Sequence, residues 1–309
     1  MAYSDQIIII CGPTASGKSE IAFKLCKEFP SGVIINADAI QIYKDIPILT
    51  SQPTKEEQDL IPHKLYGFLS PDKKYSVANW LDDVKREIDN AINQKQTPIL
   101  VGGSGMYISS LVNGIRQVPD IPEKIKSETN KLISSVGEQY LYQELIDIDK
   151  NSSEYIKNND THRIIRAYNL YQAFSITPTQ YRNFPNKAFY NREQIKVFSF
   201  LPDRELLYKN CDKRFDIMVG KGAIEEVEKL VRNNHSTASP IAKAIGFKEF
   251  FDYIKGNITK AQAIDKAKQH TRNYAKRQIT WFRNQLNNVD NIKQDNMLSL
   301  IEEIKSKIC

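Results

Sequence analysis

A short segment near the start of the sequence has the residue types and the spacing of a phosphate-binding loop. Residues 12–19 read Gly-Pro-Thr-Ala-Ser-Gly-Lys-Ser, which matches the pattern G-x-x-x-x-G-K-S/T in full. Glycines let such a loop curl so that backbone N–H groups converge on phosphate oxygens, and the helix that follows points its positive end at them. The motif therefore predicts a polyphosphate site, without indicating which polyphosphate it holds.

The side chains of this loop have distinct expected roles. Lys18 would supply a positive charge for the terminal phosphate, and the Ser19 hydroxyl would be a ligand for Mg²⁺. The expected phosphate-binding residues are Gly12, Pro13, Thr14, Ala15, Ser16, Gly17, Lys18 and Ser19. An apolar run before the loop and apolar residues at helical spacing after it give the strand-loop-helix context of a phosphate-binding loop, which argues against a chance match.

A second polar loop carries a carboxylate and a carboxamide. The segment "VIINAD" reads as a buried strand that ends in Asp38, and Gln41 follows three residues later. Asp38 could act as a general base, and Gln41 could read a base edge, because glutamine pairs with the N6/N7 edge of adenine. A metal-supporting or helix-capping aspartate is an equally good interpretation of Asp38. The residue types alone do not decide between them.

A third loop follows another apolar run. Residues 102–105 read Gly-Gly-Ser-Gly, and Ser104 could hydrogen-bond a phosphate or a substrate amine. A plain tight turn is the alternative interpretation, because glycine-rich stretches mark turns in general.

The elements that must position these loops are readable from hydrophobic patterning. Apolar runs at 7–11, 32–38, 97–101 and 194–201 predict strands buried on both faces, and helical patterns lie between them. Alternating strands and helices predict an α/β fold: a P-loop NTPase-like parallel sheet flanked by helices. Ligands of such sheets bind at the carboxyl ends of the strands, where the three loops would meet.

One part of the sequence differs from this pattern. Residues 119–193 contain no convincing buried strand and are bounded by "PDIP" and "TPTQYRNFPN". We expect them to form a helical insertion domain. The catalytic core would then comprise 1–118 and 194–309, with helical patterning from about 204 to 286.

Composition and charge limit the classes of function. The chain has 309 residues, a net charge of +6 and four widely separated cysteines. Such cysteine usage fits a reducing cytosol and argues against a disulfide framework or a zinc site. No stretch approaches the roughly 18 apolar residues of a membrane span, and the early apolar run is too short for a signal peptide. We expect a cytoplasmic monomer without membrane contact, and the charge hints at a polyanionic partner.

Basic residues gather near the C-terminal end of the helical region. On one helix, Arg272, Lys276 and Arg283 would fall within about 40° of one another. An adjoining apolar stripe would pack on the core, namely Ala275, Ile279, Phe282 and Leu286. A solvated basic face is the alternative, but an uninterrupted basic stripe beside Tyr274 and Trp281 favours a contact with an RNA backbone. The expected RNA contacts here are Arg272, Lys276, Arg277, Trp281 and Arg283.

Two further groups of basic residues are candidates for the same partner. His162, Arg163 and Arg166 open a helix within the insertion and could contact phosphates or a flipped base, although surface ion pairing is the alternative. The segment "AIGFK" would contribute Lys243, Gly246 and Lys248, although a turn between helices needs glycine too.

Eight motifs in order along the chain carry a family resemblance. They are "GPTASGKS", "DAIQIY", "IPHKL", "VGGSGMYISSLVNG", "NDTHRIIRA", "KRFDIMVGKGAIEEV", "AIGFKE" and "TRNYAKRQITWFR". Together they resemble the tRNA dimethylallyltransferase family, over about residues 7–283. The adenylate isopentenyltransferases are a related family, but the long insertion and the basic helix favour the tRNA enzymes. The absence of a zinc-finger extension implies the bacterial form.

The resemblance implies a reaction. The loop would hold dimethylallyl diphosphate, and Lys18, Arg214 and Mg²⁺ on Ser19 would stabilise the departing diphosphate. Asp38 would accept a proton from the N6 amine of the adenosine immediately 3′ of the tRNA anticodon, and Ser104 would orient or relay. The resemblance further implies that tRNA contacts the helical insertion domain, and that it contacts Asp38, Ala39, Ile40 and Gln41 of the core.

The sequence departs from the family pattern at two of these positions. Ala39 stands where the family commonly has serine, so this side chain cannot make the hydrogen bond that a serine could make to the target base. Ser104 stands where threonine is usual, which preserves the hydroxyl.

Two alternatives remain open from the residues. A P-loop kinase of a small metabolite would bind ATP in the same loop, and would need neither the insertion nor the basic helix. A non-catalytic RNA-binding protein could use the loop as a nucleotide switch, and would have no separate use for Asp38.

Overall fold

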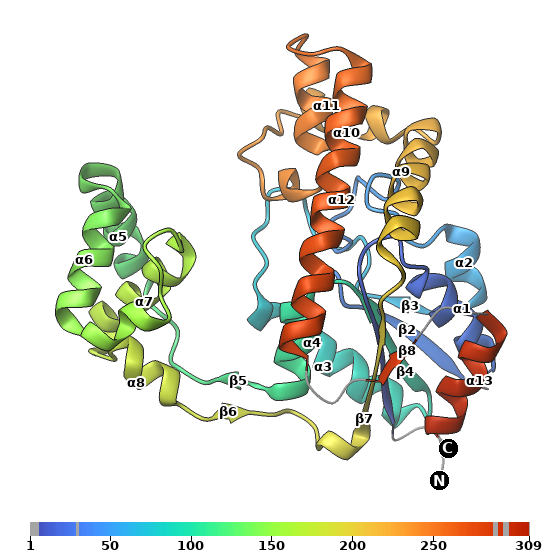
Figure 1. Ribbon diagram of the computed structural model, residues 1–309, viewed down its shortest axis with the longest axis horizontal. Coiled ribbons are helices and arrows are strands. Elements are labelled where there is room, and N and C mark those ends of the chain that lie inside the picture. The colour runs from blue at the N-terminus through green and yellow to red at the C-terminus, as the bar shows by residue number, and fades with distance from the viewer. Residues whose placement is uncertain (1–5, 29–30, 287–289, 293–296, 309) are drawn as a thin grey trace. The chain divides into compact units, whose positions relative to one another are not determined.

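The chain folds into two compact units that are built from different elements. The computed structural model (Figure 1) describes residues 6–28, 31–286, 290–292 and 297–308. One unit comprises Met1–Val112 and Phe189–Cys309, and the other comprises Asn113–Ala188.

The first unit contains a six-stranded parallel sheet within the described residues, in the order β3-β2-β4-β1-β7-β8. Its strands are β1 (Ile7–Cys11), β2 (Gly32–Asn36), β3 (His63–Lys64), β4 (Thr97–Gly102), β7 (Ile195–Phe200) and β8 (Asp290–Ile292). The four strands expected from apolar runs are confirmed, as is the P-loop-like α/β fold. The two strands that patterning missed, β3 and β8, are the short strands at the sheet edges.

Helices surround this sheet and extend beyond it (Figure 1). They are α1 (Lys18–Glu28), α2 (Lys55–Leu60), α3 (Val77–Asn93), α4 (Gly105–Asn113), α9 (Arg204–Gly220), α10 (Ala223–Arg232), α11 (Phe247–Ile254), α12 (Lys260–Gln285) and α13 (Met297–Ile308), with 3₁₀ turns at Arg192–Gln194 and Pro240–Lys243. Helix α12 begins with a capping box, in which Thr259 and Gln262 satisfy each other's backbone amides.

The register brings the functional loops to one edge of the sheet. Cys11, the last residue of β1, lies opposite Gly102 of β4 and Ser199 of β7. Glycine is required where these loops meet. A Cβ on Gly102 would lie 2.0 Å from the carbonyl oxygen of Ala37, and one on Gly12 would lie 2.4 Å from that of Phe200. The end of β4 is therefore held in direct backbone contact with the segment after β2, and the loop after β1 with the end of β7.

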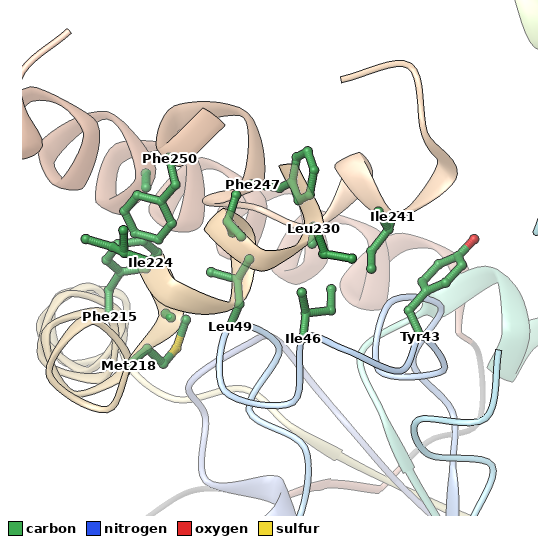
Figure 2. Close-up of a cluster of buried hydrophobic side chains, with 14 of the residues drawn as sticks. Tyr43, Ile46, Leu49, Phe215, Met218, Ile224, Leu230, Ile241, Phe247 and Phe250 are labelled. Carbon is green, nitrogen blue, oxygen red and sulfur yellow. The ribbon is translucent and has the colours of Figure 1, made fainter. Parts of the chain in front are cut away.

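The first unit has separate apolar clusters. One lies between the sheet and helices α1 and α13, and another lies among the helices that follow β7. Strand residues such as Ile8 and Ile99 pack with α1 and with Ile301 and Ile304 of α13. A second cluster lies among α9, α10, α11 and the segment after β2, which Figure 2 shows. There the turn that contains Leu49 is buried against aromatic side chains of α9 and α11. This packing fixes the segment after β2 to the helices that follow β7.

The second unit is mainly helical. It contains β5 (Ile115–Arg116), α5 (Glu123–Val136), α6 (Glu138–Ile148), a 3₁₀ turn (Lys150–Glu154), α7 (Thr161–Phe174), α8 (Pro178–Asn183) and β6 (Asn186–Lys187). A small apolar core joins α6 and α7, and the buried hydroxyl of Thr129 donates to Oδ1 of Asn169 at 2.6 Å.

The bounds of this unit differ from the expected insertion of 119–193 at both ends. The cause is a short antiparallel pairing of β5 with β6, which apolar patterning does not reveal because β6 is exposed. After β6 the chain already contacts the first unit's own elements, since the Tyr190 hydroxyl donates to Oδ1 of Asp89 on α3 at 2.8 Å.

Candidate active site

A cavity of about 650 Å³ lies at the carboxyl edge of the sheet in the first unit. Its walls come from the phosphate loop, the segment 38–41, the turn 49–51, helix α9, the segment 243–245 and helix α12. The loop predicted to bind phosphate and the loop that carries the candidate general base Asp38 therefore share one cavity.

The phosphate loop is shaped by residues with left-handed backbone angles. Ala15 has a φ of +61° and Gly17 a φ of +91°, and α1 begins directly afterwards at Lys18. The ammonium of Lys18 donates to the carbonyl oxygen of Pro13 at 3.1 Å, which holds the lysine across the loop. The hydroxyl of Ser16 is buried and has no hydrogen-bond partner among the described residues. Such a group inside the loop fits a bound oxyanion.

Charges around the loop are perturbed by burial. Desolvation lowers the pKa of Lys18 to about 8, the charge of Arg214 acts in the same direction, and Asp38 opposes both. Burial also lowers the pKa of Arg214, a residue of α9 whose guanidinium donates to the hydroxyl of Thr14. Two cations in one partly desolvated site are mutually unfavourable, and a polyanion would relieve that repulsion.

A residue that the sequence analysis did not select joins two of the loops. Gln278 of α12 is buried, and its carboxamide bonds to the backbone of Thr14 and of Gly103. The available signal was a polar residue inside the apolar stripe of α12, between Ala275 and Phe282. Both of those neighbours are buried, as the stripe predicted.

Of the two interpretations that the residue type of Asp38 left open, the structure shows the capping one, and the role of general base stays a prediction. Oδ1 of Asp38 accepts from the backbone amides of Ile40 at 2.9 Å and Gln41 at 3.4 Å, so one oxygen caps the turn. Hydrogen bonds among the described residues involve Oδ1 only, which leaves Oδ2 to accept a proton. The side-chain Nδ2 of Asn36 donates to the backbone carbonyl of Asp38 at 3.0 Å, which helps to fix the backbone here.

Ser104 connects the third loop to the second. Its hydroxyl oxygen accepts from the backbone amide of Ala39 at 2.8 Å, and its own amide donates to the carbonyl of Ala37 at 3.2 Å. The Ser104 hydroxyl proton remains available to a ligand.

Gln41 has less freedom than a base-edge reader was expected to have. Its Nε2 donates to the carbonyl oxygens of Thr50 at 2.9 Å and Ser51 at 2.8 Å, so both amide hydrogens are used. A bidentate pairing with adenine requires one donor and one acceptor, and it would break one of these bonds. The acceptor Oε1 is the part of Gln41 left for a ligand.

Part of the basic face of α12 is engaged in an ion pair. Arg272 forms an ion pair of 2.5 Å with Asp212 of α9, while Lys276 and Arg283 are exposed. The expected uninterrupted basic stripe is therefore interrupted by a carboxylate from a segment distant in sequence. Arg277 lines the cavity and lies 5.6 Å from the ring centroid of Tyr274.

The segment 243–248 and Trp281 have structural contacts as well. Lys243 is exposed and lines the cavity, and Lys248 is exposed. Gly246 has a φ of +100°, and its Cβ would lie 2.8 Å from Leu49, so this glycine is needed for packing. The Trp281 ring lies against Gly105, where a Cβ would approach to 2.2 Å.

The predicted RNA contacts of the insertion lie on α7 in the second unit. His162, Arg163 and Arg166 are exposed, and Arg163 pairs with Asp160 at 3.2 Å, which is the surface ion pair considered from the sequence. Their contact with RNA stays a prediction.

Two general features complete the description. No helix among the described residues is long and apolar enough to span a membrane. Of the cysteines, Cys11, Cys26 and Cys211 are buried thiols without a disulfide partner in the described chain, and Cys309 lies outside the described residues.

Comparison with known proteins gives consistent results. Residues 41–285 match the family model for IPP transferase. The tRNA dimethylallyltransferase of Ehrlichia chaffeensis is 39% identical over 303 residues, covering 98% of each chain. The crystal structure of tRNA delta(2)-isopentenylpyrophosphate transferase from Staphylococcus epidermidis has 33% identity and a TM-score of 0.69, with 98% of each chain covered. The full-length tRNA isopentenylpyrophosphate transferase from Bacillus halodurans has 31% identity and a TM-score of 0.71, covering 98% of this chain and 97% of that one.

Proposed function

The chain belongs to the IPP transferase family, and on that premise we propose that it prenylates the adenosine 3′-adjacent to a tRNA anticodon. The donor would be dimethylallyl diphosphate, and the acceptor would be the N6 amine of that adenosine. The family membership supports a tRNA-acting prenyltransferase over a small-metabolite kinase.

The observation that carries the proposal is the sharing of one cavity by the phosphate loop and Asp38. In the reaction the bond between the allylic carbon and the diphosphate oxygen breaks, and a bond from N6 to that carbon forms. Pyrophosphate leaves with the electron pair of the broken bond, and the proton lost by N6 passes to the carboxylate of Asp38. The free Oδ2 of Asp38 can take this proton, while Oδ1 keeps its backbone hydrogen bonds.

The cations of the cavity would stabilise the leaving group. Lys18 and Arg214 place two positive charges beside the phosphate loop, and Ser16 offers an unsatisfied buried hydroxyl. Fixed positive charge directed at a developing oxyanion lowers the barrier most where water is excluded. The amine of adenine is a weak nucleophile, so the positioning of both substrates must supply much of the rate.

The oxygen donors of the cavity fit Mg²⁺. The hydroxyl of Ser19, in the first turn of α1, and the carboxylate of Asp38 both line it, and hard divalent cations prefer such oxygen ligands. We propose that Ser19 holds the ion. When bound, Mg²⁺ would neutralise charge on the diphosphate.

The tRNA would extend from the cavity over basic residues. Lys243 and Arg277 line the cavity, and Lys276 and Arg283 are exposed on α12. We propose these four as phosphate contacts in the first unit, with His162, Arg163 and Arg166 as contacts from the second. The cytoplasmic location and the monomeric state remain predictions.

The decisive experiment offers two candidate polyphosphate substrates in parallel, a prenyl donor and a phosphate donor. Unmodified tRNA, Mg²⁺ and the protein are incubated with dimethylallyl diphosphate or with ATP, and the tRNA is digested and analysed by mass spectrometry. The prenyl donor should yield pyrophosphate and a five-carbon gain confined to the adenosine 3′ of the anticodon, and Lys18→Ala should abolish it. Phosphate transfer from ATP to a small molecule, with no modified nucleoside, would contradict the proposal.

A further inference from the structure

One half-buried carboxylate of the first unit is bonded to backbone amides instead of a basic side chain. Glu226 lies on α10, and its two oxygens accept from the amides of Ile48 at 2.8 Å and Leu49 at 2.9 Å. No ion pair with Glu226 is found in the described part of the chain. A half-buried carboxylate that is satisfied only by two backbone donors is committed to holding that backbone in place.

The segment that it holds is a single helical turn after β2. The amide of Thr50 donates to the carbonyl of Ile46, and the amide of Ser51 donates to that of Ile48. The first amides of such a turn have no carbonyl partner within it, and Glu226 satisfies them as an N-cap side chain would. Leu49 anchors the turn by packing into the cluster of α9 and α11 side chains in Figure 2.

The other end of the same turn is bonded to Gln41. The last carbonyls of the turn, on Thr50 and Ser51, accept both amide hydrogens of Gln41. The turn is therefore satisfied at its start by Glu226 and at its end by Gln41. Both Gln41 and residues 49–51 line the cavity.

This arrangement makes Gln41 a hydrogen-bond acceptor and removes its capacity to donate. A free carboxamide can rotate to offer either end, so it accepts an amine and a carbonyl equally well. A carboxamide whose donors are both used offers Oε1 alone. The exocyclic amine at C6 of adenine is a donor, whereas the oxygen at C6 of hypoxanthine or guanine is an acceptor and would face Oε1 unfavourably.

We propose that Glu226 is a positioning residue for base selection, which acts by fixing the turn 46–51 and, through it, the acceptor-only orientation of Gln41. The inference rests on the proposed function, because it assumes that the target base enters this cavity. Glu226 itself is not among the residues that line the cavity. In Glu226→Gln the new amide places a donor against a backbone N–H, so one anchoring bond is lost and the turn can shift its carbonyls away from Gln41.

The test measures binding in the absence of the prenyl donor. Two anticodon stem-loops are compared, identical except that the target position carries adenosine in one and inosine in the other. For the wild-type protein we expect about fivefold to tenfold tighter binding of the adenosine stem-loop. Adenosine forms one hydrogen bond with Oε1 of Gln41, whereas inosine places an acceptor against that oxygen, and the difference corresponds to about this ratio of affinities. In Glu226→Gln the ratio should fall to about twofold, while Glu225→Gln, an exposed neighbour on the same helix, should keep the wild-type ratio.

A double-mutant cycle separates positioning from general damage. Gln41→Leu should lower the ratio on its own, and adding Glu226→Gln to it should change the ratio no further, because the two residues act through one bond network. A protein that is merely destabilised loses active fraction without losing the preference between the two stem-loops. If Glu226→Gln is too unstable to measure, Glu226→Asp replaces it, since the shorter side chain cannot reach both amides.

Each outcome bears on a different statement. An unchanged ratio in a folded Glu226→Gln protein would overturn the positioning role, and so would a further loss of preference when Glu226→Gln is added to Gln41→Leu. A wild-type protein that modifies no tRNA would instead overturn the proposed function.

Discussion

The backbone amide of Thr14 donates a hydrogen bond of 2.8 Å to Oε1 of Gln278, which lies 264 residues further along the chain. The other end of the same carboxamide donates to the carbonyl of Gly103, also at 2.8 Å. One buried side chain of α12 therefore fixes the phosphate loop relative to the loop that carries Ser104. Under the proposed function these two loops hold the leaving group and the attacking amine, so Gln278 sets how they face each other.

Replacing this side chain should affect both stability and donor binding. Gln278→Leu leaves the Thr14 amide and the Gly103 carbonyl buried without partners, and we expect the free energy of unfolding to fall by about 1–3 kcal/mol. The KM for dimethylallyl diphosphate should also rise. Urea unfolding and steady-state kinetics measure the two effects. Gln285→Leu, at an exposed position of the same helix, should stay within about 0.5 kcal/mol of wild type, and an equal loss there would contradict the bridging role.

The lowered pKa of Lys18 predicts a pH dependence of donor binding. With a pKa of about 8 in the free protein, Lys18 is mostly charged below that pH and mostly neutral well above it. Only the ammonium attracts the diphosphate, so affinity should be nearly constant below pH 8 and fall up to tenfold per pH unit above it. Calorimetric titration with dimethylallyl diphosphate between pH 7 and 9.5 measures this. Lys18→Arg stays charged over the range and should show a flatter profile, whatever its absolute affinity. Parallel profiles for the two proteins would assign the titration to another group.

Asp38→Asn should separate catalysis from shape. The asparagine oxygen can still accept from the amides of Ile40 and Gln41, so the turn is kept while the proton acceptor is lost. We expect turnover to fall by several orders of magnitude with tRNA affinity near wild type. Asp38→Ala, which also removes the cap, should additionally weaken tRNA binding. Near-normal turnover in Asp38→Asn would exclude Asp38 as the base.

The basic residues of α12 should differ in their effect on tRNA binding. Arg277→Ala, at the cavity, should reduce the slope of log affinity against log salt by somewhat under about one unit. Arg272→Ala should change this slope less, because the charge of Arg272 is already paired with Asp212. Filter binding over a range of salt concentrations measures both slopes. A larger effect at Arg272 than at Arg277 would show that the ion pair opens when tRNA binds.

The sequence predicted the central strands and the loops because both depend on local chemistry. A glycine-rich loop between a buried strand and a helix has few other uses, and buried parallel strands read as apolar runs. The edge strands β3 and β8 were missed because strands of two or three residues carry no hydrophobic period. They pair only because longer neighbouring strands offer them an edge.

Long-range polar contacts were beyond the reach of sequence patterning. Nothing local links Glu226 to Leu49, Asp212 to Arg272, or Gln278 to Thr14, because each pair is joined only after the fold brings distant segments together. For the same reason the basic stripe was read as uninterrupted. The candidate site was thus predictable in its reactive groups, and much less so in the side chains that hold them.

The bond between Thr14 and Gln278 has a consequence for biosynthesis. A ribosome that adds about 5–20 residues per second needs on the order of tens of seconds to make the 264 residues that separate the two. During that interval the nascent chain exposes a phosphate loop that lacks its α12 partner. The loop is translated first but completed last, so a released fragment that ends before α12 should not compete with the finished protein for its substrates.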